Sequence, residues 1–252
     1  MKILATDYDG TVTPEGITPA FRAALDAWRA AGNLFGVVTG RPRSSIADTI
    51  YLQNFPVDFV IADNGAVICG SDMQPVLVKP VRVADVKSII GLATGIKTSF
   101  FRLDSAMAQF NTTCLPGYTY ADEETNTLFF DTYSMKDPTE VCIRFGTSEE
   151  NFAIQNRIGE VTGGRMHGFA SNPRLTDAVA AGVDKCSGIL DFVGMLDKKP
   201  ETIYTTGDAW NDLAMLTRDG FEGYCVATGQ PEVIREVGRT VKSPRELMEK
   251  FL

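Results

Sequence analysis

The stretch ILATDYDGT, residues 3–11, decides the fold, because it is a short apolar run that ends on two carboxylates. A run of this length, closed by an aspartate and a glycine, predicts a buried strand whose carboxyl end opens into a turn. Ligands bind at that edge of an open α/β sheet. If the strand stays extended to Asp9, alternation sends Asp7 and Asp9 the same way, and such like charges are costly unless a cation or a proton relieves them. The pair indicates either a divalent-metal site with a carboxylate nucleophile or two aspartates that only solvate a turn.

Composition limits the partners and the compartment. The chain has 252 residues and a net charge of −8, which argues against nucleic-acid or anionic-membrane partners, since both require a basic face. A small anionic substrate would need local cations or a metal. The five cysteines form no C-x-x-C pair, which favours free thiols in a reducing cytosol. No apolar run approaches the length of a membrane span and no signal-peptide core follows the first residues, so we expect a cytoplasmic protein.

Strand and helix patterns alternate through the first 65 residues. We predict a helix from Thr18-Pro19 to Gly32, a strand over 34–38, a short helix over 45–52 and a strand over 58–62. This order is typical of the opening half of a parallel, doubly wound sheet. Asn64-Gly65 is flanked by apolar residues and predicts a hairpin turn.

The pattern changes near residue 83 and returns near residue 185. Between these points we predict helices over 83–92 and 149–161, and strands over 98–103, 108–111, 127–132, 141–146, 165–170 and 174–179. The later main-sheet elements are a helix over 185–196, a strand over 202–206, a helix beginning near Asn211, a strand over 223–227 and a helix from Arg245. We therefore predict a core domain made of residues 1–81 and 184–252, interrupted by an α+β domain over 82–183.

Polar side chains follow several of the apolar runs. Thr39, Asp63 and Asp208 stand at strand ends, as Asp7 does, so we expect them to meet at one edge of the sheet. Asp208 and Asp212 lie four residues apart and allow two interpretations. Either their turn only caps the following helix, or Asp208 joins Asp7 around a hard divalent cation. Carboxylate and water oxygens suit Mg²⁺ in such a site.

Three further residues allow two interpretations: they bind an anion, or they have only a structural role. The hydroxyl of Thr39 and the amide of Gly40 would make a compact anion seat, but a threonine at a strand end also often caps the next helix. Lys185 begins a helix, and a lysine there is usually exposed. Beside the carboxylates it could instead hold a phosphate and screen their repulsion.

Other catalytic designs find little support in the sequence. His167 is the single histidine and lies in the inserted block, which argues against a Ser-His-Asp mechanism and excludes an H-E-x-x-H zinc site. The chain has no G-x-x-x-x-G-K-[ST] loop, and no G-x-G-x-x-G follows the first strand. Carboxylate chemistry with a metal is what these exclusions leave.

Four segments, taken together and in order, resemble the motifs of the haloacid dehalogenase (HAD) superfamily. They are DYDGT at 7–11, Thr39-Gly40-Arg41, Lys185 in GVDK at 182–185, and GDAWND at 207–212. The insertion, with DNGA at 63–66, resembles the Cof-like branch with a type II cap. The resemblance implies a Rossmann-like α/β core, doubly wound and mostly parallel, with an inserted α+β cap.

The resemblance also implies a role for each motif residue. Asp7 would be the nucleophile that accepts the phosphoryl group, and Asp9 would protonate the leaving alcohol and then activate water. Mg²⁺ would be held by the Asp7 carboxylate, the Asp9 backbone carbonyl and Asp208, with Asp212 behind them. The residues that would bind the phosphate are Thr39, Gly40, Lys185 and Asn211.

The implied function is a Mg²⁺-dependent phosphatase, a cytoplasmic monomer or small homo-oligomer acting on a small phosphorylated metabolite such as a sugar phosphate. A phosphomutase or phosphotransferase with the same site is an alternative, and a phospho-receiver using Asp63, or a non-catalytic sensor, is a weaker one. Arg144, Arg165 and His167 are candidates for substrate contacts in the cap, although each also fits an ordinary solvated surface.

Overall fold

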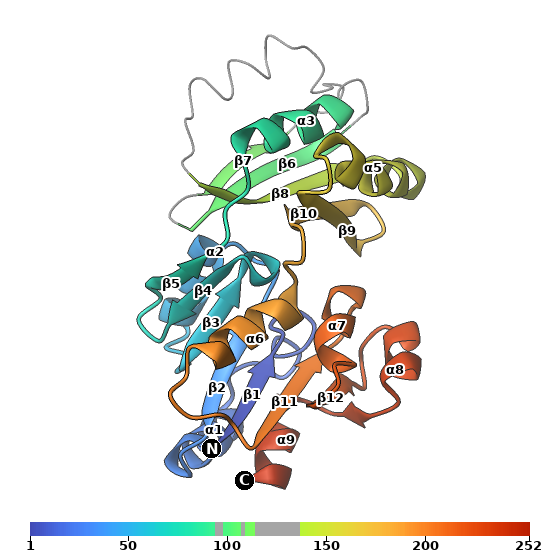
Figure 1. Ribbon diagram of the computed structural model, residues 1–252. Coiled ribbons are helices and arrows are strands. Elements are labelled where there is room, and N and C mark those ends of the chain that lie inside the picture. The colour runs from blue at the N-terminus through green and yellow to red at the C-terminus, as the bar shows by residue number, and fades with distance from the viewer. Residues whose placement is uncertain (94–97, 107–108, 114–136) are drawn as a thin grey trace. The chain divides into compact units, whose positions relative to one another are not determined.

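The computed structural model in Figure 1 describes residues 1–93, 98–106, 109–113 and 137–252. The predicted strand over 127–132 and the first residue of the predicted strand over 108–111 lie outside these residues. The chain divides into two compact units. One contains residues 1–41, 45–77 and 184–252, and the other contains residues 42–44 and 78–183. The sequence placed the first division at 81/82 and the second at 183/184.

The first unit, called the core unit below, is built on an eight-stranded sheet with the order β13-β12-β11-β1-β2-β3-β4-β5. The strands are β1 (Lys2–Thr6), β2 (Leu34–Val38), β3 (Phe59–Ala62), β4 (Val67–Gly70), β5 (Pro75–Val78), β11 (Thr202–Gly207), β12 (Phe221–Val226) and β13 (Thr240–Val241). From β13 to β3 every neighbouring pair is parallel, and β4 runs antiparallel to β3. The predicted doubly wound, mostly parallel sheet and its hairpin are confirmed.

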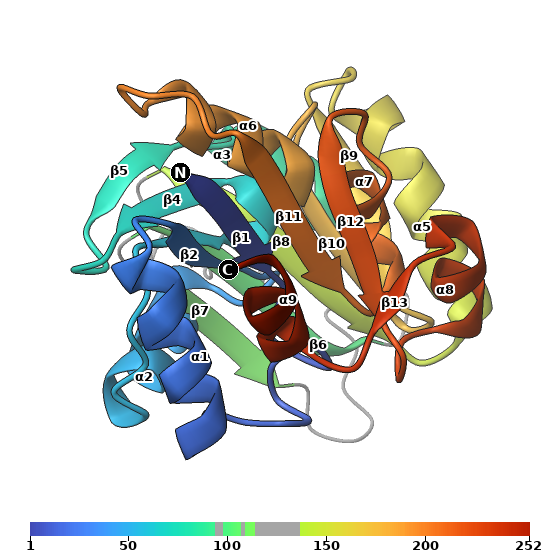
Figure 2. The ribbon, with the colours of Figure 1, turned by 90° about the horizontal axis from the view of Figure 1, so that it is seen from below.

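Helices cover both faces of this sheet. They are α1 (Pro19–Ala30), α2 (Arg43–Leu52), α6 (Lys185–Gly194), α7 (Leu213–Leu216), α8 (Pro231–Val237) and α9 (Pro244–Phe251). Helices α1 and α9 pack together, and α6 packs with α7; Figure 2 shows the two pairs on opposite sides of the strands. Ile3 and Ala5 of β1 are buried in one cluster with residues of α6 and α7, as strand alternation requires.

Local sequence explains where α1 begins and which side it buries. The Thr18 hydroxyl accepts a hydrogen bond from the Phe21 amide, and proline fills the first helical position. Phe21, Leu25 and Trp28 recur at helical spacing and are fully buried. The indole N–H of Trp28 donates to the carbonyl of Leu34 at 2.9 Å, which ties the helix to β2.

Some elements of the core unit differ from the prediction in detail. The helix expected near Asn211 is a 3₁₀ turn, Trp210–Asp212, followed by α7, which has only four residues. Helix α6 ends at Gly194, two residues earlier than predicted. Strands β5 and β13 were not predicted, because both are short and pair at the margins of the sheet, where periodicity is weak.

The second unit, called the cap unit below, contains a five-stranded sheet with the order β7-β6-β8-β10-β9. Its elements are α3 (Val83–Ala93), β6 (Thr98–Ser105), β7 (Gln109–Thr113), β8 (Pro138–Phe145), α5 (Ser148–Val161), β9 (Met166–Asn172) and β10 (Leu175–Ala180). All paired strands are antiparallel, and α3 and α5 pack on the sheet through one apolar cluster. The predicted inserted α+β unit is confirmed.

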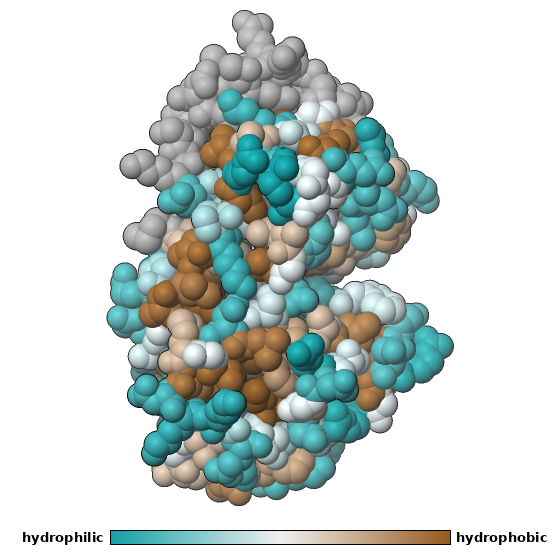
Figure 3. All heavy atoms as spheres, viewed as in Figure 1, coloured by the Kyte–Doolittle hydropathy of each residue, from teal (hydrophilic) through white to brown (hydrophobic). Residues whose placement is uncertain are grey.

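Most large apolar side chains of the described residues are buried. On the face in Figure 3, apolar side chains gather over part of the core unit, and Leu190 and Met195, at the end of α6, are 40% and 45% exposed. Among the described residues, no helix combines the length and the apolarity needed to cross a bilayer.

At Gly65 the backbone of the β3–β4 hairpin packs closely against the start of α6. Three successive residues, Asp63, Asn64 and Gly65, have positive φ angles of 50°, 51° and 109°. A Cβ at position 65 would lie 2.1 Å from the carbonyl oxygen of Asp184, the residue that caps α6. Only glycine leaves room for this contact.

We predict that Gly65→Ala lowers the free energy of unfolding by about 3 kcal/mol or more, since it adds a collision to the left-handed backbone strain. Gly32→Ala is the matched control, because its φ is +79° but its Cβ would meet no described atom within 4 Å; about 1–2 kcal/mol is expected there. Urea unfolding of both variants measures the difference. Equal losses of unfolding free energy in the two variants would show that the close contact with Asp184 does not affect stability.

Candidate active site

Asp7 and Asp208 are neighbours because the strands that precede them are neighbours. Strand β1 pairs in parallel with β11, with Thr6 opposite Thr206, so both chains leave the sheet at the same edge. The amide of Asp7 donates to the carbonyl of Thr206 at 2.8 Å, which continues the ladder by one residue. The predicted meeting of these two strand ends is what the sheet order produces.

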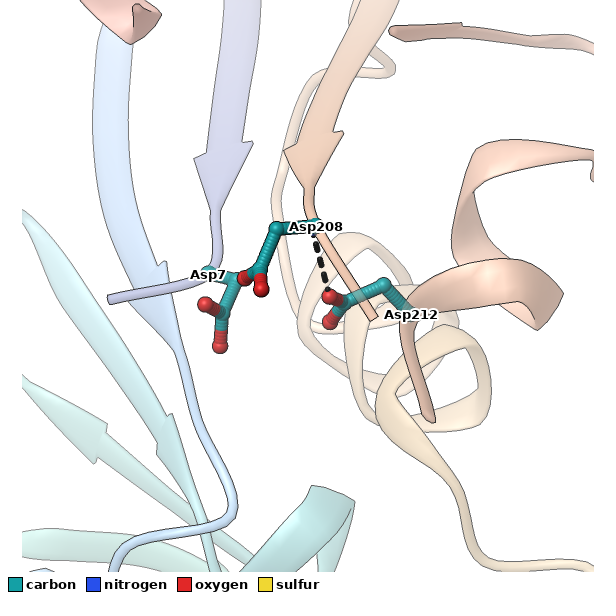
Figure 4. A group of neighbouring side chains, drawn as sticks. All are labelled: Asp7, Asp208 and Asp212. Carbon is teal, nitrogen blue, oxygen red and sulfur yellow. Dashed lines mark hydrogen bonds between the residues drawn. The ribbon is translucent and has the colours of Figure 1, made fainter. Parts of the chain in front are cut away.

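Three carboxylates gather there: Asp7, Asp208 and Asp212 each place an oxygen within 4.8 Å of the others (Figure 4). Asp212 reaches back to the strand end, and one of its oxygens accepts hydrogen bonds from the amides of Asp208 and Ala209 at 2.9 and 3.0 Å. This back-bonding closes the GDAWND turn. It also explains why Gly207 is needed, since a Cβ there would lie 2.5 Å from the Cβ of Asp212.

Lys185 joins two of these carboxylates. Its Nζ donates to Asp7 Oδ1 at 2.7 Å and to Asp212 Oδ1 at 2.6 Å, and the residue is 1% exposed. Helix α6 places it there: the Asp184 carboxylate accepts from the Ser187 amide, and the Ser187 hydroxyl accepts from the Asp184 amide. Of the two interpretations that the sequence allowed for Lys185, the structure agrees with the lysine beside the carboxylates, and its contact with a phosphate stays a prediction.

Burial and the neighbouring charges shift the pKa values of the side chains in this group. Burial raises the pKa of Asp7 well above its usual value; Lys185 opposes this shift, and Asp212 and Asp208 add to it. Burial, then Asp212, also raises the pKa of Asp208. Burial alone would lower the pKa of Lys185, but the charges of Asp212 and Asp7 outweigh it and raise that pKa. One lysine does not balance three carboxylates.

The site meets the requirements of a hard divalent cation. Asp7 Oδ2 is buried, and no donor in the described part of the chain reaches it. The Asp7 side chain stands beside the carboxylate of Asp208, and the donor set is entirely oxygen, as Mg²⁺ prefers. Burial, and after it the neighbouring carboxylates, raise the pKa values of Asp7 and Asp208, and a cation at this place would oppose both effects.

The Asp9 side chain lies outside this group of carboxylates. The alignment of Asp9 with Asp7 was expected only for a strand that extends to Asp9, and β1 ends at Thr6, so that condition is not met. Asp9 instead forms an ion pair with Arg41, and hydrogen bonding to Asp9 raises the pKa of Arg41. The side chain of Asp9 is 52% exposed, against 6% for Asp7. The role of the Asp9 backbone carbonyl as a metal ligand stays a prediction.

Two residues of the first loop, Gly10 and Thr11, contribute to the site although the sequence assigned them no role. Gly10 has φ +80°, and a Cβ there would lie 2.5 Å from the Asp208 carboxylate. The Thr11 hydroxyl donates to Asp208 Oδ1 at 3.0 Å. The signal for both was their place directly after the paired aspartates.

The other predicted phosphate contacts lie around Asn64. The Thr39 hydroxyl accepts from the amide of Arg41 at 3.0 Å, so it shapes its own loop. A Cβ on Gly40 would lie 2.9 Å from the Asn64 side chain, which also accepts a weak hydrogen bond of 3.4 Å from Asn211. Asn64 therefore connects the loops after β2 and β11. Phosphate binding by Thr39, Gly40 and Asn211 stays a prediction.

The remaining candidates are one residue of the core unit and three of the cap unit, and their roles stay predictions. Asp63, the residue a phospho-receiver would use, is fully buried at the end of β3. Within the cap unit, Arg165 forms a forked pair with Asp85 of α3, with Nη2 to Oδ1 at 2.7 Å and Nε to Oδ2 at 3.0 Å. The His167 ring lies 5.7 Å from that of Phe169. Arg144 is exposed, as a solvated surface residue would be.

Comparison with known families agrees with this geometry. The family model described as haloacid dehalogenase-like hydrolase matches residues 4–246. The chain belongs to this family. The predicted membership of the HAD superfamily and its Cof-like branch is confirmed, and so is the prediction that this HAD protein is an enzyme of the hydrolase class.

Solved structures of HAD proteins share the fold at low sequence identity. BT1666 from Bacteroides thetaiotaomicron, described as a HAD phosphatase, is 19% identical with a TM-score of 0.78 over 99% of this chain and 93% of its own. BT4131, described as a subclass IIB sugar phosphatase, is 20% identical with a TM-score of 0.75 over 100% and 99%. A haloacid dehalogenase-like hydrolase from B. subtilis is 17% identical with a TM-score of 0.79 over the whole of both chains.

We predict that Lys185→Met destabilises this HAD hydrolase by roughly 3–5 kcal/mol in metal-free buffer, because it leaves buried carboxylates without a counter-charge. Urea unfolding in EDTA measures the loss, and Lys198→Met, at an exposed lysine, serves as the control. Adding Mg²⁺ is expected to restore part of the loss. A stability equal to that of the control would contradict the electrostatic role of Lys185.

Proposed function

We propose that the chain is a Mg²⁺-dependent phosphatase that hydrolyses a small phosphorylated metabolite, a sugar phosphate or a related ester, through a phosphorylated Asp7. The observation that carries the proposal is the state of Asp7. Lys185 holds one of its oxygens, the other is buried without a donor among the described residues, and the side chain lies beside Asp208. A buried carboxylate with a free oxygen can act as a nucleophile.

Two half-reactions follow from the two carboxylates of the first loop. An Asp7 oxygen attacks phosphorus, the ester P–O bond breaks, and Asp9 gives a proton to the departing alcohol oxygen. Asp9 then takes a proton from water as the water oxygen attacks the phosphorus, and the Asp7 carboxylate leaves. Asp7 is buried and Asp9 is half exposed, so the two carboxylates proposed for these roles lie in different environments.

The phosphate oxygens would be held by donors of the surrounding loops. Lys185 uses two of its three N–H groups for Asp7 and Asp212, which leaves one for a phosphate oxygen. The Thr39 hydroxyl, the Gly40 amide and the Asn211 side chain would complete the seat. The carboxylates of Asp7 and Asp208 and the carbonyl of Asp9 would hold Mg²⁺, with Asp212 behind them. When bound, the ion neutralises charge on the transferring phosphoryl group.

The substrate class is supported by three facts. The chain belongs to a hydrolase family. One protein of the same fold is described as a sugar phosphatase. The negative net charge is suited to a small ligand held by a local site better than to a polyanion. A cytoplasmic location and a monomer or small homo-oligomer stay predictions.

The first test is phosphate release from a panel of sugar phosphates, nucleotides and an aryl phosphate, with Mg²⁺ or with EDTA. We expect turnover that needs the metal and that Asp7→Asn lowers to below about 0.1% of the parent, since the nucleophile is lost. Asp219→Asn, at an exposed aspartate of the same unit, is the control and should keep full activity.

Three outcomes distinguish the candidate functions. Transfer of phosphate to an added sugar in place of water would favour the phosphotransferase alternative. A stable phosphoprotein without turnover would favour a receiver. Full activity in Asp7→Asn, or none in the folded parent with Mg²⁺, would contradict the proposal.

Metal binding has a readout that does not depend on activity. We predict that Mg²⁺ at about 100 times its dissociation constant raises the Tm of the parent by roughly 5–10 °C. In Asp208→Asn that shift should shrink strongly, whereas the variant without metal should be at least as stable as the parent, because it loses a like charge. Differential scanning fluorimetry tests both. An equal Mg²⁺ shift in Asp208→Asn would place the ion elsewhere.

A further inference from the structure

We propose that Arg41 is a positioning residue, whose guanidinium fixes the carboxylate of Asp9 and presents it in one orientation to the leaving group and the attacking water. The inference rests on the proposed function, since it requires Asp9 to be the acid and base. Arg41 lies in a segment that the sequence singled out, but neither the family resemblance nor the site chemistry above gave it a task.

The contact between the two side chains is forked. Arg41 Nε donates to Asp9 Oδ2 and Nη2 donates to Asp9 Oδ1, both at 2.6 Å. Two parallel hydrogen bonds between planar groups fix rotation as well as distance, which a single lysine donor cannot do. Asp9 therefore has one orientation in this pair although half of its side chain is exposed.

Arg41 is itself held from three sides, so it can act as a fixed support. Its remaining terminal nitrogen, Nη1, donates to the hydroxyl of Thr49 in α2 at 2.9 Å. The guanidinium carbon lies 5.0 Å from the centroid of the Tyr8 ring, within the range of a cation–π contact. Its backbone amide donates to the hydroxyl of Thr39. These contacts are independent of Asp9.

The pair leaves Asp9 able to react. A carboxylate has about four lone-pair sites, and the fork uses one on each oxygen. The other two can accept or deliver a proton, and the exposure of Asp9 leaves them accessible. An unsupported aspartate at a half-exposed position would divide its time among rotamers, and each misdirected rotamer lowers the rate of proton transfer.

A difference between leaving groups isolates this role. An alkyl phosphate needs a proton on the departing oxygen, whereas the nitrophenolate of p-nitrophenyl phosphate leaves as a stable anion without one. Loss of Arg41 should therefore slow the first step for the alkyl ester and spare it for the aryl ester. The aryl substrate still needs Asp9 for the second step, so phosphorylated enzyme should accumulate.

The experiment measures single-turnover rates and KM for both esters in the parent, Arg41→Gln and Arg41→Lys. For Arg41→Gln we expect a loss of about tenfold or more with the alkyl ester, a change below about threefold in the nitrophenolate burst, and little change in KM. Arg41→Lys, which restores the charge and one donor, should recover part of the alkyl rate. Thr49→Val, which removes the support of Nη1, should show the same pattern more weakly, and it decides the matter if Arg41→Gln does not fold.

Arg29→Gln is the matched control. Arg29 forms a similar forked pair with Asp58 in the same unit, with Nη2 to Oδ1 at 2.7 Å and Nε to the same carboxylate at 3.1 Å, at the far end of β2 from Thr39. Both rates should equal those of the parent. Equal losses with the two esters in Arg41→Gln, a rise in KM alone, or no loss would overturn the positioning role while leaving the phosphatase intact. A parent inactive on both esters would overturn both proposals.

Discussion

The buried ammonium group of Lys185 is the interaction on which the rest of the site depends. It lies between Asp7 and Asp212, residues 178 and 27 positions away in the sequence, and is as fully buried as they are. Carboxylates so close together would repel one another without a cation among them. Because the lysine offsets this repulsion, the carboxyl end of β1, the turn after β11 and the start of α6 can converge at a buried position.

The backbone around this lysine is built for close approach. The Thr206 hydroxyl donates to that of Thr6, which donates to the carbonyl of Asp7, so β1 and β11 are joined just before the carboxylates. Gly10 and Gly207 stand where a Cβ would collide with Asp208 and Asp212. Side chains of the loops can therefore meet only because these positions have none.

Much of the candidate site was predictable because the family motifs stand at strand ends, and parallel strands deliver their ends to one edge. Asp7 and Asp208 illustrate this. The orientation of Asp9 was not predictable, since it depends on where β1 stops and on the distant Arg41. The short length of α7 was not predictable either, because the chain turns at Thr217 to enter β12, and packing decides that point.

The sequence by itself determined the elements whose causes are local. The Thr18-Pro19 start of α1, its buried Phe21–Leu25–Trp28 stripe and the β3–β4 hairpin all follow from residues a few positions apart. Only the tertiary structure decided which charges meet. Lys185 is buried between Asp7 and Asp212, and Arg41 binds Asp9 across 32 positions, because helix packing and sheet order bring those side chains together. Periodicity and capping act over one or two turns, whereas a charge pair depends on every element that lies between its members.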